Sequence, residues 1–86
     1  MEAIIRGYPW PADKALSTAF CESRMDPAAI SPDGEDIGLF QLAWRWHAWR
    51  AGGDWRALLE PEVNVRVAYD IWAETGDWRA WPWCGR

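Results

Sequence analysis

Glu22 is a candidate for acid–base chemistry, because its neighbours in the sequence include the apolar residues Phe20, Cys21 and Met25. A carboxyl group with such neighbours is partly removed from water, and burial penalises the charged form and raises the pKa. A raised pKa keeps a proton available near neutral pH, as a general acid requires. The alternative is a structural carboxylate that caps its helix or pairs with an arginine such as Arg24 or Arg45. Composition and spacing alone leave both interpretations open.

The segments that must position Glu22 are predicted to be mainly helical. Residues 1–11 are expected to form an irregular lead-in, because the prolines of Tyr8-Pro9-Trp10-Pro11 disfavour helical geometry before them. Helical spacing begins at Ala12 and continues to about Ser23, and Glu22 falls on the flank of its apolar face. That face is predicted to consist of Ala12, Ala15, Leu16, Ala19 and Phe20.

The rest of the chain predicts one more long helix and little sheet. Residues 24–37 carry turn residues and are expected to form a loop, followed by an extended turn or strand over Gly38–Leu42. A helix is predicted over residues 43–51, ending at the glycines that follow. The clearest helix covers Pro61–Thr75, with proline in its first turn and Gly76 after its end. The fold class is therefore mainly α, a small α+β domain with a short β element at most.

Length and composition indicate a single small domain, residues 1–86. A core of this size usually needs extra stabilisation, and the chain offers nine tryptophans and two cysteines. The net charge of −4 argues against a nucleic-acid partner. No apolar run approaches membrane-spanning length. Two cysteines and one histidine are too few for a structural zinc site, so neither metal nor cofactor is expected.

Several short motifs follow one another between Glu22 and Val65. The first is Glu22-Ser23, followed by Asp26-Pro27 and the turn Ser31-Pro32-Asp33-Gly34. The second is Gly38-Leu39-Phe40-Gln41-Leu42, and the third is the helix start Leu59–Val65. In their order and spacing, these motifs resemble the soluble lytic transglycosylases. The chain departs from that family by an extra residue between Gly34 and Gly38, by Phe40 in place of methionine, and by lacking a later Ala-Tyr-Asn-Ala-Gly segment.

The two ends of the matching region resemble a related group, the resuscitation-promoting factors. Their catalytic segment opens with Cys-Glu-Ser and their domain closes with Trp-Pro-x-Cys, here Cys21-Glu22-Ser23 and Trp81-Pro82-Trp83-Cys84. The resemblance implies a disulfide between Cys21 and Cys84. If the cysteines pair, the chain-entropy account credits the bond with roughly 4 kcal/mol. Such a bond persists in an oxidising compartment.

The resemblance implies a lysozyme-like fold with a central catalytic helix. It also implies cleavage of the β-1,4 bond between N-acetylmuramic acid and N-acetylglucosamine in peptidoglycan. Glu22 matches the catalytic acid/base, and Ser31 and Gln41 match polar residues that line the sugar site. Lytic transglycosylases need one glutamate, because the muramic acid 6-hydroxyl attacks within the substrate.

A hydrolysing muramidase is the first alternative, because hydrolysing glycosidases usually use two carboxylates. Asp33, Glu35 and Asp36 are the candidates for the second carboxylate. If they are instead solvated loop charges with roles in the turns, the single-glutamate transglycosylase reaction is favoured. A non-catalytic module that binds cell walls is the other alternative.

Most tryptophans are expected in the core, because large apolar groups contribute most to a small domain. Trp44 and Trp81 are the candidates for stacking on sugar, and Tyr69 either offers its hydroxyl to the glycan or packs in the core. His47 is expected on a helix surface, and Asn64 is expected to satisfy backbone groups.

The expected setting is the cell wall, outside the cytoplasm or in the periplasm. The first residues lack the basic and apolar regions of a signal peptide. The small size and the lack of these regions suggest a domain of a phage lysin, a phage tail-associated protein or a larger secreted bacterial protein. The domain is expected to be monomeric.

Overall fold

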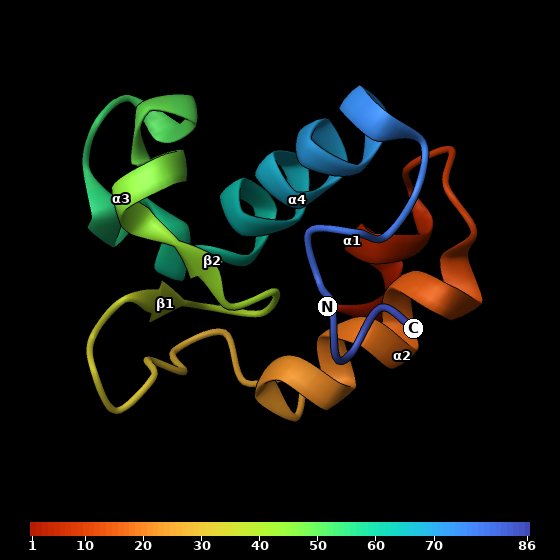
Figure 1. Cartoon of the computed structure of the whole chain (residues 1–86), viewed down its shortest axis with the longest axis horizontal. Coiled ribbons are helices and arrows are strands. Elements are labelled where there is room, and N and C mark those ends of the chain that lie inside the picture. Colours follow the sequence, from red (N-terminus) through yellow and green to blue (C-terminus); the bar gives the residue numbers. More distant parts are fainter.

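The computed structural model describes residues 1–86 and contains four α-helices, two 3-10 helices and a two-stranded sheet. In Figure 1 the hairpin and α3 lie at one side of the molecule and α1 at the other, while the C-terminal segment runs back from α4 to α2. The predicted class, mainly α with a short β element, is confirmed. The elements in chain order are α1 (Glu2–Arg6), α2 (Ala12–Ser23), β1 (Asp36–Ile37), β2 (Leu42–Ala43), α3 (Trp44–His47), η1 (Ala48–Ala51), η2 (Trp55–Leu59) and α4 (Pro61–Thr75).

Helix α4 has the predicted bounds and supplies one side of the core. Pro61 occupies its first turn, and Gly76 ends it in the left-handed conformation with φ of 74°. Its buried residues are Asn64, Val65, Val67, Ala68 and Ile71. The helix predicted over 43–51 is found as α3 followed by η1, and it ends at Gly52 with φ of 81°.

The N-terminal segment corrects one prediction, because the lead-in is not irregular throughout. Glu2–Arg6 forms α1, whose Ile5 is fully buried. Trp10 lies over this turn and donates from Nε1 to the Ile5 carbonyl oxygen at 2.8 Å. A helix of five residues is not stable on its own, so tertiary packing around Ile5 must hold it. It is also too short to show a helical period in the sequence. The stretch from Tyr8 to Pro11 is not helical, as predicted.

Helix α2 also has the predicted bounds, but its buried face differs from the predicted one. Phe20 is 53% exposed, where the sequence pattern placed it in the core. The buried positions are instead the small residues Ala15, Thr18, Ala19 and Ser23. Small side chains allow the C-terminal segment to lie close along α2, with Thr18 Oγ1 3.5 Å from the Cys84 carbonyl oxygen.

The hairpin between β1 and β2 is anchored by one buried side chain of α4. Strand register pairs Asp36 with Ala43 and Ile37 with Leu42, and Gly38–Gln41 forms the turn. The Asn64 amide donates to the carbonyl oxygens of Ile37 at 2.9 Å and Leu58 at 2.8 Å, and accepts from the Phe40 backbone N–H at 3.0 Å. The prediction that Asn64 satisfies backbone groups is confirmed.

Replacing Asn64 with alanine is expected to lower the free energy of unfolding by about 3 kcal/mol or more, since a buried polar group left without a partner costs about 1–3 kcal/mol. Three backbone groups lose their partner in this variant. Urea denaturation measures the effect, with Asn64→Asp as a comparison that keeps the shape and loses the two donated bonds. An unchanged unfolding midpoint for Asn64→Ala would contradict this role.

Candidate active site

A cavity of about 440 Å³ opens where the end of α2, the hairpin, α3, α4 and the C-terminal segment meet. Glu22 lies in its wall, half-buried. The cavity combines a few polar groups with apolar surface, as ligand sites do. Its lining consists of Glu22, Asp36, Gln41, Leu42, Ala43, His47, Ile71, Ala80, Trp81, Pro82, Trp83 and Cys84.

Glu22 lies in a partly desolvated environment that favours the protonated form of its carboxyl group. It lies in the last turn of α2, which ends at Arg24 in the left-handed conformation with φ of 57°. Burial raises the pKa of Glu22, and the negative charge of Asp36 raises it further. No basic side chain forms an ion pair with Glu22: the Arg24 guanidinium lies over the Phe20 ring. The alternative of an arginine-paired structural carboxylate therefore does not describe this residue.

The three loop acids have three different environments. Asp33 accepts hydrogen bonds from the Ser31 hydroxyl at 2.6 Å and the Glu35 backbone N–H at 3.0 Å, and these bonds lower its pKa. Glu35 forms an ion pair with Arg45 at 2.7 Å. Asp36 alone lines the cavity, where burial and then the charges of Asp33 and Glu35 raise its pKa. Asp36 is therefore the loop acid that shares a site with Glu22.

The two polar residues matched to the sugar site lie in different places. Gln41 lines the cavity, and its amide nitrogen donates to the carbonyl oxygens of Ala29 and Gly38 at 3.1 and 3.0 Å. Ser31 lies outside the lining, where its hydroxyl accepts from the Asp36 backbone N–H at 2.9 Å. Ser31 thus holds the turn that brings Asp36 to the cavity.

The aromatic candidates are also divided between the cavity and its surroundings. Trp81 lines the cavity but is 3% exposed, and its Nε1 donates to the Phe40 carbonyl oxygen at 2.9 Å. Trp44 lies outside the lining and donates from Nε1 to the Gly34 carbonyl oxygen at 3.0 Å. Tyr69 packs in an aromatic cluster, with its ring stacked on Tyr8 at 5.0 Å.

Two of the aromatic residues in the cavity lining, Trp83 and His47, were not predicted as site residues from the sequence. Trp83 is 73% exposed on the cavity wall, with the Arg86 guanidinium 4.3 Å from one ring face. His47 was expected on a helix surface and instead lines the cavity, half-buried. Both positions depend on contacts between distant segments, and no local sequence signal marks them.

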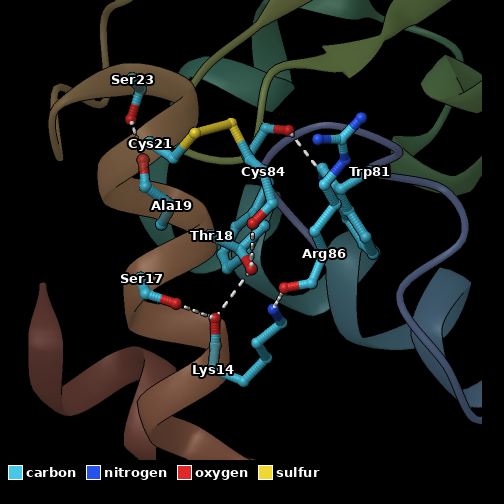
Figure 2. The surroundings of a disulfide bond; sticks show 10 residues. Lys14, Ser17, Thr18, Ala19, Cys21, Ser23, Trp81, Cys84 and Arg86 are labelled. Carbon is cyan, nitrogen blue, oxygen red and sulfur yellow. Dashed lines mark hydrogen bonds between the residues drawn. A yellow bond between two sulfur atoms is a disulfide. The ribbon is translucent and has the colours of Figure 1, made fainter.

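The predicted disulfide between Cys21 and Cys84 is present in the structure. Figure 2 shows the bond joining α2 to the C-terminal segment, which lies alongside the helix. Cys21 directly precedes Glu22 in the chain, and Cys84 lines the cavity. The disulfide thus ties the helix that carries Glu22 to the C-terminal segment of the cavity wall, and a disulfide is consistent with action outside the cell.

The fold and the site define a small helical domain with a half-buried acid in an open cavity. The lysozyme-like domain family matches residues 9–83, and the chain belongs to this family. No match is found among curated proteins or among solved structures. Members of the family are generally glycoside-cleaving enzymes, and membership implies peptidoglycan as the substrate. No helix has the length and apolar character needed to cross a membrane.

Proposed function

We propose that this domain cleaves the β-1,4 bond between N-acetylmuramic acid and N-acetylglucosamine as a lytic transglycosylase with Glu22 as its single acid/base. The observation that carries the proposal is the state of Glu22. It lies in the cavity wall, its pKa is raised by burial, and no cation pairs with it. A raised pKa keeps a carboxyl group protonated up to a higher pH, which favours delivery of its proton to a leaving oxygen.

Two proton transfers complete the proposed reaction. Glu22 first donates its proton to the glycosidic oxygen, so the bond from that oxygen to muramic acid C1 breaks. The Glu22 carboxylate then takes the proton of the muramic acid 6-hydroxyl, whose oxygen bonds to C1. The products are a 1,6-anhydromuramic acid end and a free 4-hydroxyl on the other sugar. Glu22 is protonated again, and no water is consumed.

The other proposed site residues divide into glycan contacts and supports. Gln41 lines the cavity, and we assign it to glycan binding, whereas Trp81, which is 3% exposed, supports the cavity wall instead of stacking on sugar. Ser31 acts through the turn that holds Asp36. Trp44 and Tyr69 lie outside the cavity lining and support the loop and the aromatic cluster.

A hydrolysing muramidase is the second candidate, and Asp36 favours it. Its carboxyl group lines the same cavity as Glu22, and its charge acts on Glu22. A second carboxylate in this position could orient a water for attack at C1. Mass spectrometry of peptidoglycan fragments separates the two reactions, because the anhydro product is lighter than the reducing-end product by one water. Anhydro products support the proposal, and reducing-end products overturn it in favour of hydrolysis.

The variant Asp36→Asn is expected to move the pH profile while preserving the anhydro product. The Asp36 charge raises the pKa of Glu22, so its removal lowers that pKa. Activity that needs protonated Glu22 is lost as pH rises through this pKa. The alkaline limb of kcat/KM should therefore shift to lower pH, since this limb reports the acid of the free enzyme. Loss of all product formation at every pH would show that Asp36 takes part in the chemistry.

The setting that we propose is the cell wall, for a domain of a phage lysin, a phage tail-associated protein or a secreted bacterial protein. The support is the disulfide together with the peptidoglycan substrate implied by the family. Binding to intact walls without release of soluble fragments would instead indicate a non-catalytic binding module.

A further inference from the structure

His47 has no place in the two proton transfers above, yet it lines the same cavity as Glu22, Asp36 and Gln41. It is the single histidine of the chain and the last residue of α3. Its ring is half-buried. No protein group accepts a hydrogen bond from its Nε2, whereas its Nδ1 has a partner.

The partner of His47 decides which ring nitrogen carries the proton. Arg50 Nε lies 3.3 Å from Nδ1 and donates to it. A guanidinium has no acceptor atom, and it stays charged at all ordinary pH values. Nδ1 must therefore be the unprotonated nitrogen that accepts, and the neutral ring carries its proton on Nε2.

Arg50 is itself held in place from α4. Its two terminal nitrogens donate to the Glu74 carboxylate at 2.6 and 3.0 Å, and its side chain is only 13% exposed. The arrangement is a planar two-bond pair, which fixes orientation as well as charge. Glu74, Arg50 and His47 thus form a chain of hydrogen bonds that ends at Nε2.

We propose that His47 is a substrate-binding residue that donates from Nε2 to a neutral carbonyl or hydroxyl oxygen of the glycan. Arg50 and Glu74 are positioning residues that act through it. This inference rests on the proposed function for the identity of the ligand. The tautomer of His47 is inferred from its contact with Arg50 and does not depend on the proposed function.

A neutral donor suits a cavity whose acid must stay protonated. A cation there would favour the charged form of Glu22 and lower its pKa. Burial, followed by the charge of Arg50, lowers the pKa of His47, while Glu74 acts in the opposite direction. The acids that share the cavity with His47 are Glu22 and Asp36. His47 can therefore hold a sugar oxygen without adding charge beside the acid.

Nitrogen-15 NMR of the histidine ring tests the tautomer, and the single histidine makes the assignment unambiguous. The Nε2-protonated neutral form is expected at neutral pH. Arg50→Met removes the donor and should mix the tautomers and raise the pKa of His47. Arg56→Met is the matched control, because Arg56 is similarly bound to Asp54 in an exposed turn. If the neutral His47 ring of the wild-type protein carries its proton on Nδ1, the proposal is overturned.

Glycan binding is tested in the Glu22→Gln background with the N-acetylglucosamine tetramer as the probe. Adding His47→Ala should weaken binding about fivefold, as expected for one neutral hydrogen bond. His47→Gln keeps an N–H near the Nε2 position and should restore most of the affinity. Equal affinity with and without His47→Ala would refute the donor role. Failure of the wild-type protein to cleave peptidoglycan refutes the proposed function instead, and the NMR result is independent of it.

Discussion

Glu22→Gln is expected to reduce kcat for peptidoglycan cleavage by about 10²–10⁴-fold, the range supplied by general acid–base catalysis. The amide keeps the size of the carboxyl group but acts neither as a general acid nor as a general base near neutral pH, so both proposed transfers fail. Purified peptidoglycan digested with either protein, with soluble products followed by mass spectrometry, measures the loss. Glu62→Gln on the exposed face of α4 is the matched control and should cleave as the wild type does.

Stability separates a catalytic defect from a folding defect in this variant. Glu22 is desolvated and lacks a cationic partner, so its charged form is unfavourable in the folded protein. A neutral amide avoids that cost, and the melting temperature of Glu22→Gln should equal or exceed that of the wild type at neutral pH. Active sites often trade stability for function in this way. Equal rates of fragment release from both proteins would rule out Glu22 as the catalyst.

Removal of the disulfide is expected to have the largest effect on stability. The bond joins residues separated by 63 positions. Opening a loop of this length lowers the free energy of unfolding by roughly 4 kcal/mol in the chain-entropy account. The total free energy of unfolding of a native domain is only about 5–15 kcal/mol. The double variant Cys21→Ser/Cys84→Ser should therefore unfold at a much lower urea concentration than the oxidised wild type.

Reductant provides the control for this experiment. Treated with reductant, the wild-type protein should approach the midpoint of the double variant, whereas the variant itself should not respond. Activity should fall as well, because the bond connects the helix that carries Glu22 to the cavity wall at Cys84. Coincident unfolding curves for oxidised wild type and double variant would show that packing of the C-terminal segment alone holds this wall.

The sequence predicted those helices whose ends are marked by local chemistry. Pro61 and Gly76 bound α4, and apolar spacing defines α2, so both were found with their correct limits. Helix α1 was missed, because its five residues show no full period and packing around Ile5 supplies their stability. Phe20 was misplaced, because the C-terminal segment covers the small residues of α2 and leaves the ring exposed.

The candidate site was predictable only where a motif carried it. Glu22 and Gln41 were predicted as site residues from the resemblance to lytic transglycosylases, and both line the cavity. The choice among three loop acids depends on the turn made by Ser31 and Asp33, which leaves Asp36 as the one that reaches the cavity. His47 could not be identified from sequence, because its surroundings come from Arg50, from Glu74 and from cavity residues far away in the chain.

The contact between Gly38 and Asn64 limits how the sequence of this domain can drift. A Cβ atom on residue 38 would lie 2.4 Å from the Asn64 amide nitrogen, and the φ of Gly38 is +79°. Asn64 in turn fills that space while binding three backbone groups. Changes at two residues in contact do not add independently. Each position therefore restricts the mutations open to the other, and the Leu58 carbonyl oxygen, which would also lie 2.4 Å from a Cβ on residue 38, restricts residue 38 further.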